Sequence, residues 1–590
     1  MVSDAELKID DFDVAPEEDR LYRMRHSAAH IMAQAVIEMM PEAKLAIGPP
    51  IDSGFYYDFL LPRSISADEL PAIEARMREV VAANVPFEES RVPKEEARQI
   101  FAGQPFKLEL IDSFDGEDVG LCRHDTFLDL CRGRHVERSG EVGAFKLMHI
   151  AGAYWRGDEN RPMLTRIYGA LFATPAELEA YERHLEEARA RDHRRLGREL
   201  GLFYLVDDIG SGLPVFTPKG EMVRHLMESF VRETQAKHGY QHVWTGNVVR
   251  EQLFKKSGHY DNYADVMFPP MVDGDNVFRL KPMNCPSHMT LYNEMGVHSY
   301  RELPLRFCEF ATLYRYEESG AIGGLTRVRS LTQDDCHVFC RPDQIEEEFT
   351  RCLHMVREVL TAFGMTEYRL QLSLRGQEGK YVADDEKWDA ATRALKSALD
   401  KNGVQYMPVE GEAAFYGPKA DLMAKDALGR EWQLSTIQID FIQPARLGCE
   451  YIGEDGQPHT PVLIHRAVMG STERFLGVLI EHYAGAFPLW LAPVQAVVIP
   501  IADRHNDYAF QVQRALQEAG LRAEVDHRTE RMNAKIRDAQ LQKVPYMLVV
   551  GDRESEANAA AVRLRNNENL GPMPIGDIVA RMQDEVGRKV

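Results

Sequence analysis

A highly charged stretch, residues 175–201, most constrains how this chain can fold. Its sequence, PAELEAYERHLEEARARDHRRLGRELG, has a helical pattern and is typical of a solvated connecting helix. The 590 residues are also too many for one hydrophobic core. We therefore place one domain boundary at this stretch and a second at the proline-rich FPLWLAP, residues 487–493. The expected parts are an acidic leader (1–20), a first domain (21–174), a helical linker (175–200), a second domain (201–490) and a third domain (491–590).

Each domain shows its own secondary-structure pattern, and together they predict an α+β multidomain protein. Residues 26–40 form a strong helix pattern that Pro41 stops. Residues 47–150 alternate strand-like runs and turns around a helix at 68–83, as in a compact α+β domain. In the second domain, residues 429–441 alternate as a central antiparallel strand would. The third domain repeats strand and helix, which predicts a small α/β domain with mostly parallel strands.

Composition excludes several classes of protein. The N-terminus lacks the basic, apolar and small-residue pattern of a signal peptide. The most apolar stretch, residues 487–502, contains three prolines and is too short to span a bilayer. We therefore expect a cytoplasmic protein without a membrane partner. The eight cysteines are sparse and irregularly spaced, which indicates free thiols and at most a few metal ligands.

The charge distribution limits how the protein can bind RNA. A net charge of −22 argues against a basic surface over the whole molecule. Residues 491–590, however, hold 14 Lys and Arg against 14 Asp and Glu, so the negative excess lies elsewhere in the chain. Any RNA contact is expected to use a local basic patch, such as residues 528–543 (RTERMNAKIRDAQLQK).

Three distant fragments each contain one soft metal ligand. They are Cys285 in LKPMNCPSH, His337 in LTQDDCHVF and His465 in LIHRAVMGSTERF. One cysteine and two histidines without a fourth protein ligand is the stoichiometry of an open zinc site, whose last position is left for water or substrate. Cys336 and Cys340 form a C-x3-C pair at helical spacing and offer a competing structural half-site, which a second pair would have to complete.

The second domain also contains arginines suited to a nucleotide. Arg315 and Glu317 precede a loop that leads to Arg327, which predicts two strands joined by a flexible connection, with Arg315 and Glu317 on one face. Arginine can hold a phosphate through two hydrogen bonds, and Arg474 at a predicted helix start adds a second clamp. A single R-x-E is most often a surface salt bridge, so the interpretation depends on the whole ordered set.

A second cluster of possible ligands lies in the first domain. His26 and His30 share one face of the predicted helix, and Asp129, Cys131 and His135 follow in LDLCRGRH. The histidines and the cysteine could hold zinc, or the histidines could orient a water molecule for hydrolysis. Taken alone, an H-x3-H pair on an Ala- and Met-rich helix is more often an ordinary surface or core pair.

These motifs resemble those of class II aminoacyl-tRNA synthetases, and specifically the threonyl-tRNA synthetase family. The resemblance rests on SGHYDNYADVMF, LKPMNCPSH, RYEESGA, TRVRSLTQDDCHVF, AAFYGPKADL, WQLSTIQIDF, LIHRAVMGSTERF and VPYMLVVGDRE, in this order. It runs from about Leu21 to the C-terminus. It implies an α+β editing domain, a catalytic domain built on an antiparallel sheet and a C-terminal α/β anticodon-binding domain. It also implies that the family's N-terminal ubiquitin-like domain is missing.

The resemblance implies a homodimeric threonine–tRNA ligase that uses ATP, Mg²⁺ and one Zn²⁺ per subunit to charge tRNA(Thr). Zinc would bind the amino group and hydroxyl of L-threonine, because a site built for a hydroxyl strongly rejects valine. Attack on the α-phosphate needs mainly positioning and charge neutralisation. The implied residues are Cys285, His337 and His465 for zinc; Gln333, Asp335 and Tyr416 for threonine; Arg315, Glu317, Arg327, Gln433 and Arg474 for ATP; Lys419 for a carboxylate or phosphate; and His259 near the terminal ribose of the tRNA.

The other two domains receive their roles from the same resemblance. Serine also carries a hydroxyl, so a second, hydrolytic site is needed to remove it from Ser-tRNA(Thr). The resemblance favours a metal-free editing pocket, although related alanine-type editing domains bind zinc. Glu554 and Arg563 would read anticodon bases through hydrogen bonds to their edges. The implied editing residues are His26, His30, Asp129, Cys131 and His135.

Six positions depart from the family's pattern while all the implied ligands and phosphate-binding arginines are retained. Gly246 replaces a proline, Leu331 a phenylalanine that stacks on adenine, Gly323 a histidine, Ser287 a glycine, Gln443 a leucine and Arg134 a proline. We therefore hypothesise an active but divergent synthetase, whose altered pocket rim would suit an inhibitor-resistant second copy.

Two competing interpretations predict different residues. A synthetase-like regulatory protein that binds RNA or an amino acid is expected to lose Arg315, Arg474 or a zinc ligand, and all are present. A free-standing editing hydrolase has no need of the 390 residues that follow position 200.

Overall fold

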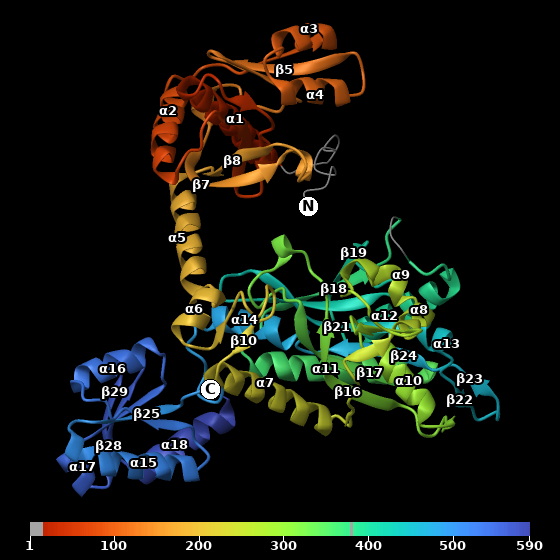
Figure 1. Cartoon of the computed structure of the whole chain (residues 1–590), viewed down its shortest axis with the longest axis vertical. Helices are drawn as coiled ribbons and strands as arrows, with labels where there is room; N and C mark the ends of the chain where they lie inside the picture. Colours follow the sequence, from red (N-terminus) through yellow and green to blue (C-terminus); the bar gives the residue numbers. More distant parts are fainter. Residues whose placement is uncertain (1–15, 378–380, 590) are drawn as a thin grey trace. The chain divides into compact units, whose positions relative to one another are not determined.

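A computed structural model describes residues 16–377 and 381–589 (Figure 1). The chain divides into two compact units, residues 1–186 and 187–590. The expected acidic leader, residues 1–20, lies mostly outside the described residues, and helix α1 already begins at Pro16. Among the described residues, no helix combines the length and apolar character needed to cross a membrane.

The first unit packs helix α1 (Pro16–Met39) against a five-stranded antiparallel sheet. Alanines such as Ala28 and Ala29 are fully buried, and their small side chains let the helix lie close to the sheet. The predicted helix at 68–83 is confirmed as a short 3-10 turn followed by α2 (Leu70–Ala82). The sheet has the order β1 (Lys44–Leu45), β3 (Gly54–Leu60), β8 (Met163–Phe172) and β7 (Ala144–Tyr154), with β2 (Pro50–Ile51) paired to β3.

A smaller antiparallel sheet completes this unit. It pairs β4 (Glu88–Pro93), β5 (Asp118–His124) and β6 (Phe127–Leu130), and it carries α3 (Lys94–Ile100) and α4 (Pro105–Ser113). Cys131 follows directly on β6, so the end of this strand leads into the segment that holds the predicted cysteine and histidine ligands. Helix α5 (Pro175–Arg191) occupies the charged stretch, as predicted.

The second unit is built around an eight-stranded sheet whose inner pairs are all antiparallel, as expected for the second domain. Only the edge pairs β11–β16 and β18–β19 are parallel. The predicted central strand at 429–441 is confirmed as β21, between β24 and β20. The strands, in order across the sheet, are β11 (Gln241–His242), β16 (Leu305–Tyr314), β17 (Ser330–Cys340), β24 (Val462–Ala467), β21 (Glu431–Asp440), β20 (Lys419–Lys425), β18 (Tyr368–Leu374) and β19 (Tyr406–Glu410).

One large hydrophobic core joins this sheet to its helices. Helix α11 packs on β21 and β24, and α14 packs on β17, so the strands that carry predicted site residues have rigid support. The helices are α6 (His193–Glu199), α7 (Pro218–Lys237), α11 (Ile345–Ala362), α12 (Asp385–Lys401) and α14 (Thr472–His482). The shorter helices are α8 (Glu251–Ser257), α9 (His259–Tyr263), α10 (Cys285–Glu294) and α13 (Gln443–Leu447). The remaining strands form three small sheets. The first pairs β9 (Phe203–Tyr204) with β10 (Val215–Phe216), the second has the order β12 (Val248–Arg250), β14 (Asn276–Leu280) and β13 (Met271–Asp273), and the third has the order β15 (His298–Ser299), β22 (Tyr451–Ile452) and β23 (Pro458–His459).

One local prediction is wrong, and one alternative finds no support in the described residues. Residues 315–317 and 327–329 are not strands, because the ladder ends at Tyr314 and Ser330. One more backbone hydrogen bond, from the N–H of Arg315 to the carbonyl oxygen of Arg329 at 2.9 Å, joins the two segments before they take other partners. The backbone N–H of Tyr316, for example, donates to the carbonyl oxygen of Val266 at 2.7 Å. Cys336 and Cys340 lie on strand β17 and not on a helix, and neither belongs to a metal-capable cluster among the described residues.

The C-terminal part of the second unit has its own five-stranded sheet. Strand β25 (Ala496–Pro500) runs parallel to β26 (Ala523–Val525) and β27 (Tyr546–Val550), which confirms the predicted strand and helix alternation. A hairpin of β28 (Ala559–Leu564) and β29 (Asn569–Pro574) then adds two antiparallel pairings that the sequence pattern did not indicate. The helices are α15 (Asn506–Glu518), α16 (Met532–Leu541), α17 (Asp552–Glu556) and α18 (Ile575–Arg588).

Candidate active site

A cavity of about 510 Å³ opens on the eight-stranded sheet and gathers side chains from distant parts of the second unit. They come from the connection between β16 and β17, from four of the inner strands, from the start of α10 and from the start of α14. The predicted site residues in its lining are Cys285, Arg315, Glu317, Arg327, Gln333, Asp335, Tyr416, Lys419, Gln433, His465 and Arg474.

The three predicted zinc ligands meet beside this cavity: Cys285 and His465 line it, and His337 is fully buried against His465. His337 on β17 and His465 on β24 are direct cross-strand partners, and Cys285 is the first residue of α10. One ligand atom from each lies within 4.8 Å of the others, and Nε2 of His337 is 3.1 Å from Nδ1 of His465. Nitrogen ligands of a tetrahedral zinc ion lie about 3.3 Å apart, so this spacing suits the metal.

Residues outside the trio hold the histidine rings in a ligating orientation. Nε2 of His465 lies 3.0 Å from a carboxylate oxygen of Asp440, and Nδ1 of His337 lies 2.8 Å from Nδ1 of His288. His288 in turn lies 3.1 Å from Glu309 through Nε2. A proton on that Nε2 leaves Nδ1 of His288 free to accept from His337, so Nε2 of His337 keeps its lone pair for a metal.

The electrostatics of the trio also suit a divalent cation. Burial lowers the pKa of His337 well below its usual value, which keeps the ring neutral. Burial raises the pKa of the Cys285 thiol, and a bound cation would supply the positive charge that stabilises its thiolate. The residues present therefore fit Zn²⁺, with Asp440, His288 and Glu309 as supports. The sequence motifs contained Asp440 and His288 without singling them out, and Glu309 lies outside them.

We expect His288→Ala to weaken zinc binding about 10- to 100-fold, because His337 loses the partner that fixes its ring. The measurement is competition for zinc with a chelator of known affinity. His298→Ala provides the control, since His298 is also buried but contacts Tyr292 and Glu302. Equal zinc affinity in the His288 variant and the unchanged protein would contradict this role.

Arg315, Arg327 and Arg474 form a cationic group in the lining of the same cavity. Burial lowers the pKa of Arg474, and the positive charges of Arg315 and Arg327 lower it further. Arg474 donates from Nε to the carbonyl oxygen of Thr326 at 2.9 Å, while Nε of Arg315 is buried without a hydrogen-bond partner. Arg327 is paired with Glu317 at 2.8 Å. Neighbouring like charges with one unsatisfied buried donor call for an anion, and phosphate suits them.

Two residues that the sequence analysis missed organise the cavity wall. Asp421 lies 2.8 Å from Nζ of Lys419 and accepts at 2.7 Å from Nε2 of Gln433. Gln438 accepts from the hydroxyl of Tyr416 at 2.5 Å. Asp421 stands two residues after Lys419 on β20, and side chains two apart on a strand share a face, so this spacing was the available signal.

His259 does not line the cavity. It is fully buried, its Nδ1 lies 2.8 Å from the hydroxyl of Ser257, and its Nε2 lies 3.7 Å from Sγ of Cys285. Burial lowers its pKa to about 3. In this structure His259 packs against Cys285, the first residue of α10.

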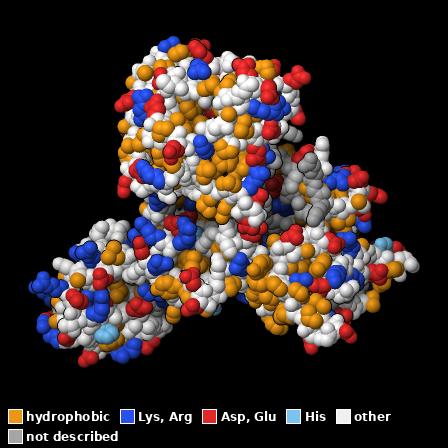
Figure 2. All heavy atoms as spheres, turned by 45° about the horizontal axis from the view of Figure 1, so that its top comes forward, with side chains coloured by type: hydrophobic (Ala, Val, Ile, Leu, Met, Phe, Trp, Pro, Cys, Tyr) orange, Lys and Arg blue, Asp and Glu red, His pale blue; other side chains and the backbone are white. Residues whose placement is uncertain are grey.

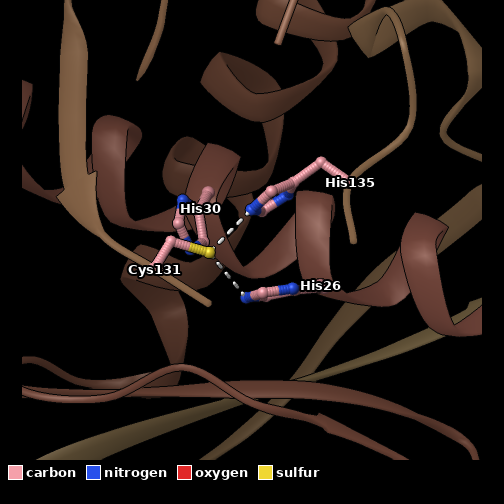
Figure 3. Close-up of side chains that lie close together, drawn as sticks. All are labelled: His26, His30, Cys131 and His135. Carbon is pink, nitrogen blue, oxygen red and sulfur yellow. Dashed lines mark hydrogen bonds between the residues drawn. The ribbon is translucent and has the colours of Figure 1, made fainter. Parts of the chain in front are cut away.

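The second predicted cluster assembles in the first unit (Figure 3). His26 and His30 extend from α1, and Cys131 and His135 from the segment after β6. Sγ of Cys131 lies 3.0 Å from Nε2 of His135 and 3.6 Å from Nε2 of His26. Burial lowers the pKa of His26 to about 4, so the rings are neutral and can accept a proton or hold a metal. Nδ1 of both His26 and His30 is buried without a hydrogen-bond partner.

Asp129 lies at the edge of this cluster in a buried ion pair. It lies 2.5 Å from Nζ of Lys107, accepts at 2.6 Å from the hydroxyl of Tyr57, and lies 3.9 Å from Nε2 of His30. Lys107 is 2% exposed and Asp129 1%, so each needs the other. Neither Lys107 nor Tyr57 carried a motif, because their role depends on packing alone.

The predicted anticodon residues lie in the C-terminal part of the second unit. Arg563 is exposed on β28, and Glu554 on α17 accepts from the backbone N–H of Gly551 at 3.0 Å. Figure 2 shows basic side chains on this part, with acidic ones among them. The basic patch at 528–543 is smaller than expected, because Arg528 pairs with Asp526 and Asp538 and Lys535 is buried.

The departures from the family's pattern fall in different surroundings. Leu331 lines the cavity, so the position expected to stack on adenine does face it. Gln443 lies outside that lining, is fully buried, and donates from Nε2 to the carbonyl oxygen of Ser257 at 2.9 Å. Arg134 adopts a φ of +70°, a left-handed conformation that proline cannot take.

Comparison with known proteins decides the family. The chain is 59% identical to a threonine–tRNA ligase of Rubrobacter xylanophilus, with 99% of this chain and 93% of that protein covered. The chain belongs to the threonyl-tRNA synthetase family. A threonine–tRNA ligase of Thermus thermophilus is 49% identical, and the match covers 95% of this chain and 87% of that protein.

Three family models match separate parts of the synthetase, and a solved structure resembles about two thirds of it. The class II core domain of synthetases (G, H, P, S and T) matches residues 271–483, the anticodon binding domain 495–585, and the threonyl and alanyl tRNA synthetase second additional domain 119–168. The RNA binding domain of a Cryptosporidium parvum threonyl-tRNA synthetase has a TM-score of 0.64 and 37% identity, covering 67% of this chain and 98% of that one. The predicted family, enzyme class and class II architecture are confirmed, and a free-standing editing hydrolase is excluded.

Proposed function

We propose that this synthetase activates L-threonine with ATP and Mg²⁺ and transfers it to tRNA(Thr). One observation carries the proposal: Cys285 and His465, which group with His337 as soft metal ligands, line the same cavity as three arginines. The first group suits the amino group and hydroxyl of an amino acid, and the second suits the phosphates of a nucleotide.

Cys285, His337 and His465 would hold Zn²⁺ at the amino-acid end. When bound, zinc supplies a Lewis acid that can coordinate both the amino group and the side-chain hydroxyl of threonine, which valine cannot satisfy. Asp335 and Gln333 stand beside it on β17. Burial raises the pKa of Asp335, so the positive charge of a bound amino group would stabilise its carboxylate.

Arg315, Arg327 and Arg474 would position ATP and neutralise its phosphates, together with Mg²⁺. A carboxylate oxygen of threonine attacks the α-phosphorus in line, the bond to the β-phosphate oxygen breaks, and pyrophosphate leaves with the electron pair. Glu317 and Gln433 line the nucleotide region, and Lys419 supplies a further positive charge to a carboxylate or phosphate.

ATP–pyrophosphate exchange across a panel of amino acids tests this activity. We expect exchange that depends on threonine and is much weaker with valine. A zinc-replete protein without threonine-dependent exchange would overturn the proposal and favour the regulatory binding protein instead.

We also propose that His26, His30, Asp129, Cys131 and His135 form a metal-free pocket that hydrolyses Ser-tRNA(Thr). The support is the cluster of neutral, buried histidines with unsatisfied nitrogens, which can orient water at an ester. Zinc analysis tests the metal-free part: one zinc per chain agrees with it, and two would place a second ion in this cluster.

We expect His30→Ala to lower the rate of seryl-tRNA hydrolysis about 10²-fold and to leave threonine-dependent exchange unchanged, because the two sites lie in separate units. Deacylation of Ser-tRNA(Thr) and exchange are measured on the same preparation. His149→Ala in the same unit is the control, since it lies outside the cluster. Unchanged seryl-tRNA hydrolysis in the His30 variant would remove this residue from the site.

The enzyme is proposed to act as a cytoplasmic homodimer that reads the anticodon through Glu554 and Arg563. Large exposed apolar side chains support a subunit interface near the small β12–β14–β13 sheet: Trp244 is 81% exposed and Val272 on β13 is 68% exposed. A closed dimer would bury this apolar area.

We expect Trp244→Arg to raise the dimer dissociation constant at least about 10-fold, because it places a charge in an apolar contact. Molar mass from light scattering across a dilution series measures it, with Trp432→Phe, a substitution within the catalytic core, as a control. A Trp244→Arg protein that dimerises like the unchanged enzyme would contradict an interface at this position.

The inhibitor-resistant second copy stays a hypothesis, supported by Leu331 in the cavity lining. Sensitivity to an inhibitor that occupies the cavity, compared with that of a typical relative, tests it. Equal sensitivity would reject it.

A further inference from the structure

Asp192, His193 and Glu481 form a third cluster of possible metal ligands, which does not belong to the lining of the cavity. Their contacts point to a different role. Nδ1 of His193 lies 2.6 Å from Oε1 of Glu481, and Nε2 accepts from the backbone N–H of Leu325 at 3.0 Å. Both ring nitrogens are therefore occupied. Because Nε2 accepts, the proton must sit on Nδ1 and point at the carboxylate.

The ring of His193 joins three segments that are far apart in sequence. His193 is the first residue of α6, Glu481 lies near the end of α14, and Leu325 lies in the connection between β16 and β17. The residue His193 is 4% exposed, and Leu325 is fully buried. The backbone N–H of Leu325 thus has its hydrogen bond inside the protein, where water cannot replace a lost partner.

The two residues that follow Leu325 in the chain contact or supply arginines of the cavity. The carbonyl oxygen of Thr326 accepts from Nε of Arg474 at 2.9 Å, and the next residue, Arg327, lines the cavity. The backbone at 325–326 is therefore held from one side by His193 and from the other by Arg474. A shift of this backbone would move both Arg327 and the oxygen that orients Arg474.

Two glycines make room for the ring. Gly324 has a φ of +59°, and a Cβ there would lie 2.3 Å from Nε2 of His193. A Cβ on Gly477 of α14 would lie 3.2 Å from Cβ of Leu325 and 3.5 Å from Cδ2 of His193. A side chain at Gly324 would therefore displace the ring, and one at Gly477 would crowd it and Leu325.

We propose that His193 is a positioning residue for ATP, acting through its hydrogen bond to Leu325. The proposal rests on the proposed assignment of Arg327 and Arg474 to the ATP phosphates. Loss of the bond leaves the buried N–H of Leu325 unsatisfied and lets the connection between β16 and β17 move away from α6. The affinity for ATP then falls, because Arg327 and Arg474 are displaced. The threonine end depends on β17, β24 and α10 and is not affected.

Two substitutions separate the two hydrogen bonds of the ring. In His193→Asn the side-chain amide reaches the position of Nδ1 and can still donate to Glu481, but it falls short of Leu325. In His193→Gln the side-chain oxygen reaches the position of Nε2 and can still accept from Leu325. We expect His193→Asn to raise the KM for ATP in pyrophosphate exchange about 3- to 10-fold. We expect the KM for threonine and the zinc content to stay the same and His193→Gln to restore most of the ATP affinity.

Leu196→Ala is the matched control, because Leu196 is also buried on α6 but has no contact of this kind. It is expected to lower Tm without changing the KM for ATP. An unchanged KM for ATP in His193→Asn, or an equal rise in His193→Gln and Leu196→Ala, overturns the proposal. Arg327→Ala shows whether the ATP assignment falls with it: a raised KM for ATP in that variant keeps the assignment while the role of His193 is rejected.

Discussion

Replacing His465 with alanine is expected to lower kcat/KM for threonine in pyrophosphate exchange by at least about 10³-fold, roughly 4 kcal/mol. His465 is one of only three candidate protein ligands and faces His337 at 3.1 Å. Without it the zinc site has two ligands left, so the metal that would recognise the hydroxyl is lost. Exchange kinetics and zinc content per chain are measured together.

The control for this prediction is His459→Ala, because His459 is exposed on β23, contacts Asp455 and Tyr451, and lies outside the cavity lining. It should retain both activity and zinc. Loss of His465 also leaves Asp440 without its imidazole partner, so Tm is recorded for both variants. A His465→Ala protein with full zinc content and full threonine-dependent exchange would show that this trio is not the recognition site.

Replacing Arg474 with alanine is expected to lower kcat/KM for ATP about 10²- to 10³-fold, roughly 3 to 4 kcal/mol. Burial and, after it, the positive charges of Arg315 and Arg327 lower the pKa of Arg474, and the negative charge of a phosphate would offset both. The alanine variant removes one of the three charges that meet the developing negative charge in the transition state. The KM for threonine should change little.

Arg474→Lys and His482→Ala refine this result. Lysine keeps the charge but not the planar guanidinium, so we expect only partial recovery. His482 lies at the end of the same helix and outside the cavity lining, so its replacement should leave the ATP kinetics unchanged. An Arg474→Ala enzyme with normal KM and kcat for ATP would reject the phosphate role.

Sequence patterns predicted those elements whose local signals agree with their tertiary surroundings. The helix of residues 26–40 and the strand of residues 429–441 are examples, because burial on one face imposes a period that can be read directly. The segments 315–317 and 327–329 were wrong as strands for the opposite reason. Alternation continued in the sequence, but contacts such as that of Tyr316 with Val266 took the backbone out of the ladder.

Supporting residues were the hardest part of the site to predict. His288 and Asp440 lie inside quoted motifs, yet nothing in their spacing says which ligand each one orients. Lys107 and His193 stand outside every motif. Their importance comes from burial beside a carboxylate or a backbone N–H, and such neighbours are chosen by packing and not by sequence distance.

By itself the sequence determined the kinds of side chain available for chemistry and the division of the chain into separate folding regions. Soft ligands, arginines and a charged linking helix are chemical facts of composition and spacing. Only the tertiary structure decided which of these side chains meet. His337 and His465 are 128 residues apart, and the antiparallel register of β17 and β24 places their rings 3.1 Å from each other. That register depends on which faces of the strands are buried across the whole sheet, a cooperative property that no single segment carries.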